Sequence, residues 1–252
     1  EALDDMLDLV DGVIVHTTNW DRHIEQARPF VEADKAVLID KPMVGNLRDA
    51  NQLLDWAGVG KRVTGGSSLR FSAPVADFLA SPVEERGDIH TAYAATGVDE
   101  FNYGIHAYAI MSGLMGRGIL SAQYVGSSGQ KNIKLTWQDG KIGLLTIGRN
   151  AWLPFRMMVV TGKKSEFIDG SAGESPYRSL LEATLPYMSG QTDEPPLAME
   201  ELLEPELAAL AARVSWLNHG QEVFLDDLRL DDPGYDGTQF ALEYRRARMA
   251  GN

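Results

Sequence analysis

The first seventy residues alternate between short apolar runs and longer segments whose apolar residues recur every three or four positions. Continuous, β-branched runs are typical of strands buried on both faces of a parallel sheet, and the longer spacing is typical of amphipathic helices. The order strand, helix, strand, helix, strand predicts a right-handed βαβ array. The predicted strands are residues 12–18, 36–40 and 62–71, and the predicted helices are an initial segment ending near Val10 and residues 21–35 and 46–57.

Three residues define the ends of these helices. Asp21 is placed to cap the helix over 21–35, and Asn46 is placed to cap the helix over 46–57. Pro29 lies inside the first of these helices, so it should kink the helix or mark its last stretch.

From Ser72 onwards the pattern changes to partly alternating strands joined by glycine-rich turns. Asp139-Gly140 is a hairpin signal between two of these strands. The pattern predicts an open, mostly antiparallel sheet, with one face covered by helices around Ile105, Tyr177 and Leu202. The expected elements are a helix at 73–81 and strands at 88–97, 120–128, 131–140, 141–149 and 155–169.

The fold class is therefore α/β, with a parallel-sheet domain followed by an α+β domain. We assign residues 1–71 to the first domain, 72–228 to the second and 229–252 to a C-terminal tail. The tail should begin as a loop at 230–239 and end in a short, fraying surface helix at 243–252.

Composition excludes several classes of protein. The 252 residues carry a net charge of −13, which argues against nucleic acid as a partner because phosphate binding needs clustered Lys and Arg. There is no cysteine, which excludes disulfides, thiolate nucleophiles and cysteine zinc sites, and the five histidines lack a metal-ligand spacing, so no metal is expected. No apolar run is long enough to predict a membrane span, and no signal peptide is visible. A cytoplasmic protein is the expectation.

A dinucleotide-binding sheet normally has a G-x-G-x-x-G turn after its first strand. The nearest match, "GVGKRV" at residues 58–63, follows a predicted helix and enters a strand, which is the reverse of the required order. We therefore expect either a fold that binds no dinucleotide or the back portion of a longer chain.

The segment Asp40-Lys41-Pro42 ends the predicted strand at 36–40. In a doubly wound sheet, ligands bind outside the carboxyl ends of the strands. Taken alone, a surface lysine beside a proline turn is the favoured interpretation.

Three segments resemble the Gfo/Idh/MocA oxidoreductases, the glucose-fructose oxidoreductase and inositol dehydrogenase family. Residues 11–57 resemble the middle of that family, with Asp40-Lys41-Pro42 in the place of its Glu-Lys-Pro. Residues 102–116, "NYGIHAYAIMSGLMG", are similar to the segment with the family's catalytic histidine, and residues 206–225 resemble its closing helix and strand.

The resemblance implies a partial Rossmann domain that binds NAD or NADP, with roughly its first half lacking, and a substrate-binding second domain. It implies hydride transfer to or from a secondary alcohol of a sugar, polyol or sugar-derived substrate. It also implies a homodimer or homotetramer formed through the open sheet. The alternatives are an inactive relative that binds sugar or builds an oligomer, and a lyase or glycosidase that uses tightly held NAD.

The resemblance assigns the catalytic roles to four residues. Lys41 would steady the developing alkoxide, and His106 would act as the base. Asn102 stands where many members have an Asp, so the usual proton relay is in doubt; with Tyr103 it would position the substrate. Ala109 also replaces an acid that often follows the histidine.

Other candidates have competing interpretations. Thr17, Thr18 and Asn19 could touch the nicotinamide or its ribose, or could simply form a helix-entry loop, and His23 could flank the cofactor or pack against that loop. Arg70 could bind substrate or tie the domains together. The remaining candidates are Asp40 and Pro42 for the cofactor; Trp137, Trp152 and Tyr177 as sugar-stacking or core aromatics; and His16 and His90 as structural residues in strands.

Overall fold

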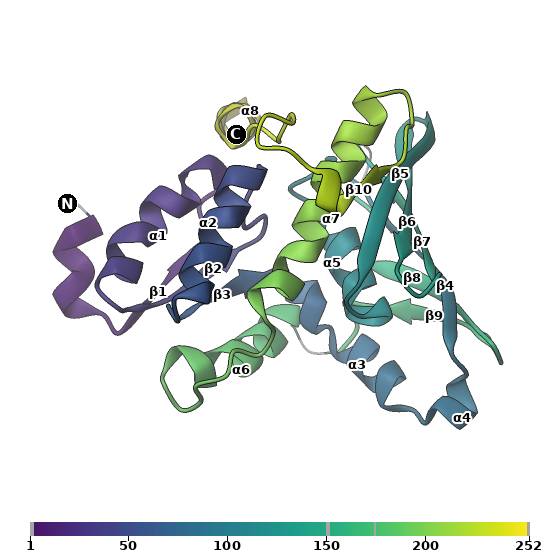
Figure 1. Ribbon diagram of the computed structural model, residues 1–252, viewed down its shortest axis with the longest axis horizontal. Coiled ribbons are helices and arrows are strands. Elements are labelled where there is room, and N and C mark those ends of the chain that lie inside the picture. The colour runs from purple at the N-terminus through teal and green to yellow at the C-terminus, as the bar shows by residue number, and fades with distance from the viewer. Residues whose placement is uncertain (1–2, 150–151, 174, 251–252) are drawn as a thin grey trace.

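The computed structural model describes residues 3–149, 152–173 and 175–250. Two sheets lie on either side of one long helix, α7 (Met199–Leu217), as Figure 1 shows. The outermost residues of both predicted terminal helices, 1–2 and 251–252, lie outside the described residues. The predicted fold class, a parallel sheet followed by a larger and mostly antiparallel one, is confirmed.

The first sheet is parallel and has the strand order β1-β2-β3. Helices α1 and α2 pack against it, and Asn46 caps α2 as predicted, because its Oδ1 accepts a hydrogen bond from Asp49 N at 2.9 Å. The elements are β1 (Gly12–Val15), β2 (Ala36–Asp40), β3 (Val63–Gly66), α1 (His23–Glu32) and α2 (Leu47–Gly58), with short 3₁₀ helices η1 (Leu3–Leu9) and η2 (Trp20–Arg22).

The start of α1 differs from the prediction. Asp21 does not cap this helix, because η2 comes first and the side chain of Asn19 accepts from Asp21 N at 3.1 Å. Strand β1 ends at Val15, so His16 lies in a loop and not in a strand. Pro29 falls in the last turn of α1, in agreement with the second of its two expected positions.

The third parallel strand is shorter than predicted because two glycines bend the chain. Gly65 and Gly66 have positive φ angles of 151° and 90°. A Cβ atom on Gly65 would lie only 2.0 Å from the carbonyl oxygen of Ile39, so only glycine fits against β2 here. The chain then enters η3 (Ser68–Phe71), where continued strand was expected.

The second sheet has the order β10-β5-β6-β7-β4-β8-β9. All neighbours are antiparallel except β4 and β7, which run parallel. The predicted hairpin at Asp139-Gly140 joins β6 to β7, whereas the single strand expected at 155–169 is two strands separated by residues 162–164. The strands are β4 (Ile89–Thr96), β5 (Ile119–Ser128), β6 (Gln130–Trp137), β7 (Ile142–Ile147), β8 (Arg156–Thr161), β9 (Ser165–Asp169) and β10 (Val223–Phe224).

Helices cover one face of this sheet. In α5 (Gly104–Met115), every residue except Gly113 is buried, as expected of a helix that is apolar all round. Helix α3 (Ala73–Ala80) packs on α5, and α4 (Val83–Arg86) follows it. Helix α6 (Pro176–Met188) was expected on this sheet as well, but it packs against η3 and the parallel strands instead.

Helix α7 belongs to both hydrophobic cores. Its first half contributes Met199, Leu202 and Leu203 to the core of the parallel sheet. Its second half contributes the alanine-rich stretch 208–212 to the core of the antiparallel sheet. Any residue in the middle of α7 therefore lies at the junction of the two cores.

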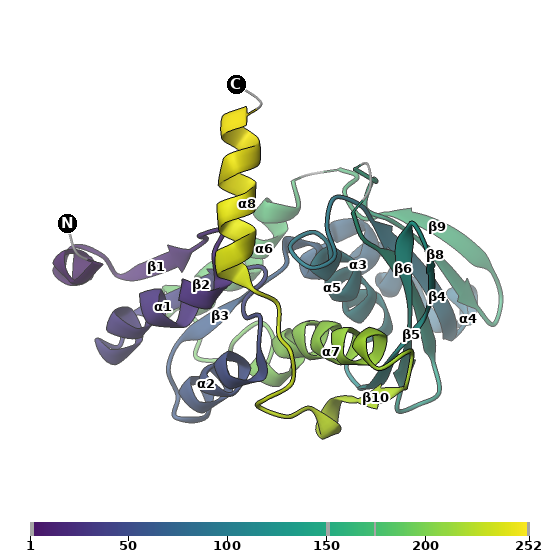
Figure 2. The same cartoon turned by 90° about the horizontal axis from the view of Figure 1, so that it is seen from above.

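The tail is more ordered than the sequence indicated. After η4 (Leu225–Asp227), helix α8 (Gly237–Ala250) begins inside the predicted loop and projects away from the body (Figure 2). It starts against the β1–α1 loop, because Trp20 Nε1 donates to Tyr235 O at 2.9 Å and Asp21 accepts from Thr238 N at 2.8 Å.

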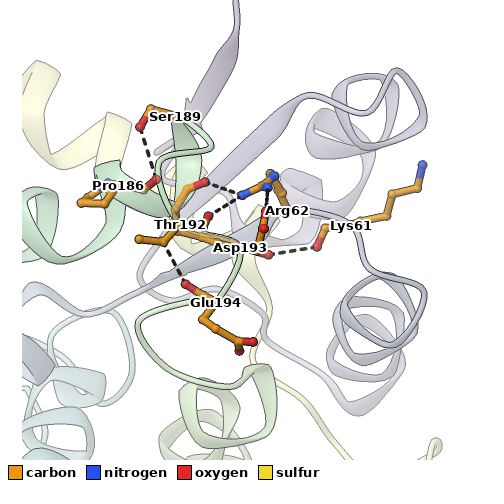
Figure 3. A network of polar contacts seen from close by, with 8 residues as sticks. Lys61, Arg62, Pro186, Ser189, Thr192, Asp193 and Glu194 are labelled. Carbon is orange, nitrogen blue, oxygen red and sulfur yellow. Dashed lines mark hydrogen bonds and ion pairs between the residues drawn. The ribbon is translucent and has the colours of Figure 1, made fainter.

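The polar loop after α6 is held by one arginine (Figure 3). Arg62, just before β3, donates to the carbonyl oxygens of Tyr187 at 2.8 Å and Thr192 at 2.9 Å. It also pairs with Asp193 at 2.6 Å, but that carboxylate is 93% exposed. The two carbonyl contacts should carry the stabilisation, since exposed ion pairs contribute little.

We expect Arg62→Ala to lower the free energy of unfolding by about 2 kcal/mol, because two charge-assisted hydrogen bonds are lost, one to the partly buried carbonyl of Tyr187 and one to the exposed carbonyl of Thr192. Asp193→Ala should change it by less than about 0.5 kcal/mol. Urea unfolding of both variants measures the difference. Equal losses would show that the exposed ion pair, and not the carbonyl contacts, holds the loop.

Candidate active site

Lys41 joins the two halves of the molecule. It follows β2 directly, and its peptide bond to Pro42 is cis. Its Nζ donates to the carbonyl oxygen of Asn102 at 2.8 Å and to Asn102 Oδ1 at 3.3 Å. The carboxyl end of the parallel sheet thereby meets the segment that leads into α5.

The surroundings of Lys41 favour its neutral form more than water does. Burial lowers the pKa of the Lys41 amine, while the charges of Asp40, Asp99 and Glu206 act in the opposite direction without cancelling that effect. The Nζ atom also lies 5.2 Å from the centroid of the Tyr103 ring.

Asp99 shapes the turn that presents Asn102 to Lys41. Its Oδ1 accepts from Phe101 N at 2.9 Å and from Tyr103 N at 3.1 Å, so the two neighbours of Asn102 are held by one carboxylate. Sequence reasoning missed Asp99. The available signal was an acid a few residues before a helix, where Asp side chains commonly bond to nearby backbone amides.

His106 lies in the first turn of α5 and is 6% exposed. Its Nδ1 is 2.7 Å from Ser67 Oγ, at the end of the glycine bend after β3. Burial, and secondly the charge of Lys41, hold the pKa of the His106 imidazole well below its ordinary value, so the ring is neutral at neutral pH. Ser67 was also missed, because its partner is distant in the sequence.

Glu206 is a buried carboxyl in the middle of α7, 2% exposed. Its Oε1 accepts from Met43 N at 3.0 Å, and its Oε2 has no hydrogen-bond partner within the described residues. Burial raises its pKa to about 8. The sequence signal was an acid that shares a helix face with Leu203 and Leu210.

His23 lies inside the molecule and supports the two loops at this edge of the sheet. Its Nδ1 lies 3.2 Å from Met43 O and its Nε2 lies 2.8 Å from Thr17 O. The ring thus connects the loop after β1 to the turn after β2.

The three other candidates in the loop after β1 lie at the same edge. Thr17 Oγ1 donates to Gln26 Oε1 at 2.8 Å, and Asn19 Nδ2 donates to Thr238 Oγ1 at 3.2 Å. Thr18 is exposed. Of these three side chains, Thr17 and Asn19 already serve the local structure.

A cavity of about 270 Å³ borders Asp40, on the side of the sheet that α6 covers. Burial raises the pKa of the Asp40 carboxyl. Tyr177, at the start of α6, is largely exposed and lines this cavity, so it is not a core residue. The lining residues are Ile14, His16, Leu38, Asp40, Tyr177, Leu180 and Leu181.

Arg70 ties the two halves together. Its guanidinium is buried and pairs with Glu201 of α7, which supports the second of its two expected roles. The other two aromatic candidates differ in burial. Trp137 is buried and donates to Gly116 O at 2.9 Å, whereas Trp152 is exposed beside Phe155. His90 lies exposed on β4.

Two further findings concern the described residues only. None of the helices over 3–149, 152–173 and 175–250 is long and apolar enough to cross a membrane. Within the same ranges, no three His, Asp or Glu side chains gather closely enough to hold a metal ion.

Comparison with known proteins confirms the predicted resemblance. Residues 1–64 match the model of the Gfo/Idh/MocA family, described as "Oxidoreductase family, NAD-binding Rossmann fold". The segment with the β1–α1 loop and Lys41 is thus similar to an oxidoreductase family with an NAD-binding fold. A search of curated proteins finds no match.

Solved structures share the fold of nearly the whole chain. A probable dehydrogenase from Thermotoga maritima superimposes with a TM-score of 0.76 at 16% identity, covering 90% of this chain and 85% of its own. A putative myo-inositol dehydrogenase from Sinorhizobium meliloti 1021 gives 0.72 at 15%, covering 88% and 84%. Scyllo-inositol dehydrogenase from Lactobacillus casei, with bound NAD(H) and scyllo-inositol, gives 0.69 at 14%, covering 90% and 84%. At these identities the likeness is one of fold.

The raised pKa of Glu206 has a consequence for stability. Between its ordinary value near 4.5 and about 8, the folded protein binds a proton that the unfolded chain releases, so the contribution of this group to stability falls as pH rises. Glu206→Gln keeps the neutral form at every pH. The difference in free energy of unfolding, variant minus wild type, should therefore rise from pH 5 to pH 8 by on the order of a few kcal/mol.

Urea unfolding across this pH range measures the gain. Glu200→Gln, an exposed carboxyl in the first turn of the same helix, is the control and should show a constant difference. A constant difference for Glu206→Gln as well would mean that Glu206 is already ionised in the folded protein at pH 5.

Proposed function

We propose that this chain is an NAD(P)-dependent oxidoreductase that transfers a hydride to or from a secondary alcohol of a sugar, polyol or sugar-derived substrate. The observation that carries the proposal is the meeting of Lys41 with Asn102, Tyr103 and His106. Lys41, at the carboxyl end of the parallel sheet, contacts the segment that leads into α5. That helix covers the other sheet and contains the buried, neutral ring of His106. Lys41 thus lies at the end of the sheet outside which doubly wound folds bind ligands.

The residues at this end of the parallel sheet fit a nicotinamide cofactor and an alcohol. The exposed Thr18, the backbone of the loop at 17–19, Asp40 and Pro42 would hold NAD or NADP at the sheet edge. The bound cofactor supplies the hydride acceptor or donor. Lys41 and His106 would flank the reacting oxygen, and between them they offer a proton acceptor and a hydrogen-bond donor.

Enzymes whose structures share this fold support the substrate class. Among them are dehydrogenases of myo-inositol, of scyllo-inositol and of UDP-N-acetylglucosamine, the last from Acidithiobacillus ferrooxidans. The three named substrates each have a ring carbon that bears a secondary hydroxyl. Polar groups at Asn102, Tyr103 and Tyr177 could bond such a ring.

A second candidate is a sugar-binding protein without catalysis. The observation that favours it is Asn102, an amide in the place where the family resemblance leads one to expect an Asp. An amide can accept from Lys41 but cannot exchange a proton at neutral pH.

Spectrophotometry of nicotinamide reduction tests the first candidate, with NAD and NADP each offered beside inositols and nucleotide sugars. Lys41→Met and His106→Gln should each lower kcat/KM by roughly 10²–10⁴, because each removes one group that contacts the reacting oxygen. His219→Asn, an exposed histidine in a left-handed turn, should leave kcat/KM unchanged.

Undiminished turnover in both variants would refute the assigned site. Sugar binding detected by calorimetry, with no turnover in the wild-type protein, would favour the second candidate.

The proposal includes a homodimer or homotetramer formed through the open face of the second sheet. Across this face, Phe167 neighbours Met158, Met158 neighbours Tyr93, and Tyr93 neighbours Leu144. Tyr93, Leu144 and Phe167 are exposed, as are Ile142 and Val160 beside them. Exposed apolar side chains that lie side by side across several strands are typical of a contact surface.

Leu144→Glu should therefore shift the protein towards monomer, because burying an unpaired carboxylate in the contact costs several kcal/mol. Size-exclusion chromatography with light scattering measures the mass. Val59→Glu, at an apolar and more exposed position after α2, should not change it. A wild-type protein that is monomeric at micromolar concentration would contradict the proposed assembly.

A further inference from the structure

Ser67 bonds to two groups in the buried region between β3 and α5. Its Oγ lies 2.7 Å from His106 Nδ1 and accepts the N–H of Leu69 at 3.1 Å. The serine is 3% exposed, so water cannot readily substitute for either partner. These two contacts determine which nitrogen of His106 carries the proton.

A serine hydroxyl has one proton to donate and two positions at which to accept. Leu69 N–H occupies one accepting position. If Nδ1 carried the proton of the neutral ring, the Ser67 proton would have no acceptor within the described contacts, and a buried donor without an acceptor is unfavourable. If Nδ1 is bare, the hydroxyl donates to it, and Ser67 Oγ, Leu69 N–H and His106 Nδ1 are all satisfied.

The other ring nitrogen is available to a ligand. Within the described residues, His106 Nε2 makes no hydrogen bond, and it is not among the fully buried polar atoms that lack a partner. It is therefore the nitrogen that a substrate can reach.

We infer that Ser67 is a positioning residue that fixes His106 in the tautomer with its proton on Nε2, so that His106 meets the substrate oxygen as a hydrogen-bond donor. The catalytic part of this inference rests on the proposed function. A neutral ring with its proton on Nε2 cannot accept a proton there, so His106 is not the base that the family resemblance implied.

The geometry leaves Lys41 as the proton acceptor. A neutral amine has two protons and one lone pair, and the two oxygens of Asn102 take both protons. Burial lowers the pKa of Lys41, against the charges of Asp40, Asp99 and Glu206 that face it from β2, the turn before α5 and α7. The lone pair of the neutral form, which burial favours relative to water, is then the group that can take a hydroxyl proton.

With these assignments, both the proton and the electron pair that leave the alcohol have an acceptor. The hydroxyl O–H bond would break with its proton passing to Lys41 Nζ, and the C–H bond would break with its electron pair leaving as hydride, for which bound oxidised NAD or NADP would supply the acceptor. The C=O bond forms as both leave. Throughout, the Nε2–H of His106 donates to that oxygen, which resembles an oxyanion-hole donor more than an acid or base.

Nitrogen-15 NMR tests the tautomer directly. Two-bond ¹H–¹⁵N correlation spectra of the full chain, labelled at histidine and recorded at pH 7 without cofactor or substrate, report which nitrogen is protonated, and His106→Gln assigns the signal. We expect a bare, pyridine-type Nδ1 and a protonated Nε2 in the wild type. Ser67→Ala should move the Nδ1 signal towards the protonated position, and Ser67→Thr, which keeps a hydroxyl, should restore it.

Ser72→Ala is the matched control. It removes another buried serine hydroxyl five residues away, one that donates to Gly170 O at 2.9 Å, and it should leave the His106 signal unchanged. A protonated Nδ1 in the wild type, or a Ser67→Ala spectrum identical to that of the wild type, would overturn the inference. If Ser67→Ala does not fold, the wild-type spectrum alone decides. Because no turnover is needed, this result is separate from a failure of the proposed function.

Discussion

The hydrogen bond from Met43 N to Glu206 is the contact on which the candidate site depends. Met43 follows Lys41 and Pro42, so holding its amide fixes where the lysine can reach. Glu206 can hold it because α7 runs through both cores, with its first half against one sheet and its second half against the other. A carboxyl at that junction is buried and mostly protonated near neutral pH. It therefore supplies a hydrogen-bond acceptor near Lys41 while adding little negative charge that would raise the pKa of the lysine.

The site exists only where the two sheets meet. Lys41 comes from the end of β2, whereas its acceptors on Asn102 and the ring of His106 come from the segment that opens α5. Buried contacts such as Arg70 with Glu201 keep these halves in register. Hinge-like movement between the sheets would therefore separate Lys41 from Asn102. The candidate groups therefore come together only when the interface between the two sheets folds.

The sequence could predict the residues whose signal is local. The strand end at Lys41, the helix cap at Asn46 and the histidine at the start of α5 were all identified from pattern or resemblance, and the structure brings Lys41, Asn102, Tyr103 and His106 together. Ser67 and Glu206 could not be found in this way, because each acts through a ring or backbone atom that only the tertiary fold places beside it. Asp99 differs, because it bonds to amides two and four residues along the chain, and that local signal was overlooked. The shortened β3 was likewise not predicted: the strand ends at Gly66, directly after Gly65, where only glycine fits against Ile39.

Asn102 illustrates how a departure from the expected pattern changes the chemistry without removing it. An Asp at this position would place a negative charge against Lys41 and hold the amine protonated. The amide offers its oxygen at 3.3 Å with no net charge, so burial is free to lower the pKa of Lys41. Under the proposed assignments, the amine is the proton acceptor and His106 is the hydrogen-bond donor. An amide at position 102 is then compatible with both functions that a hydride transfer requires, with the lysine in the role that the resemblance implies for the histidine.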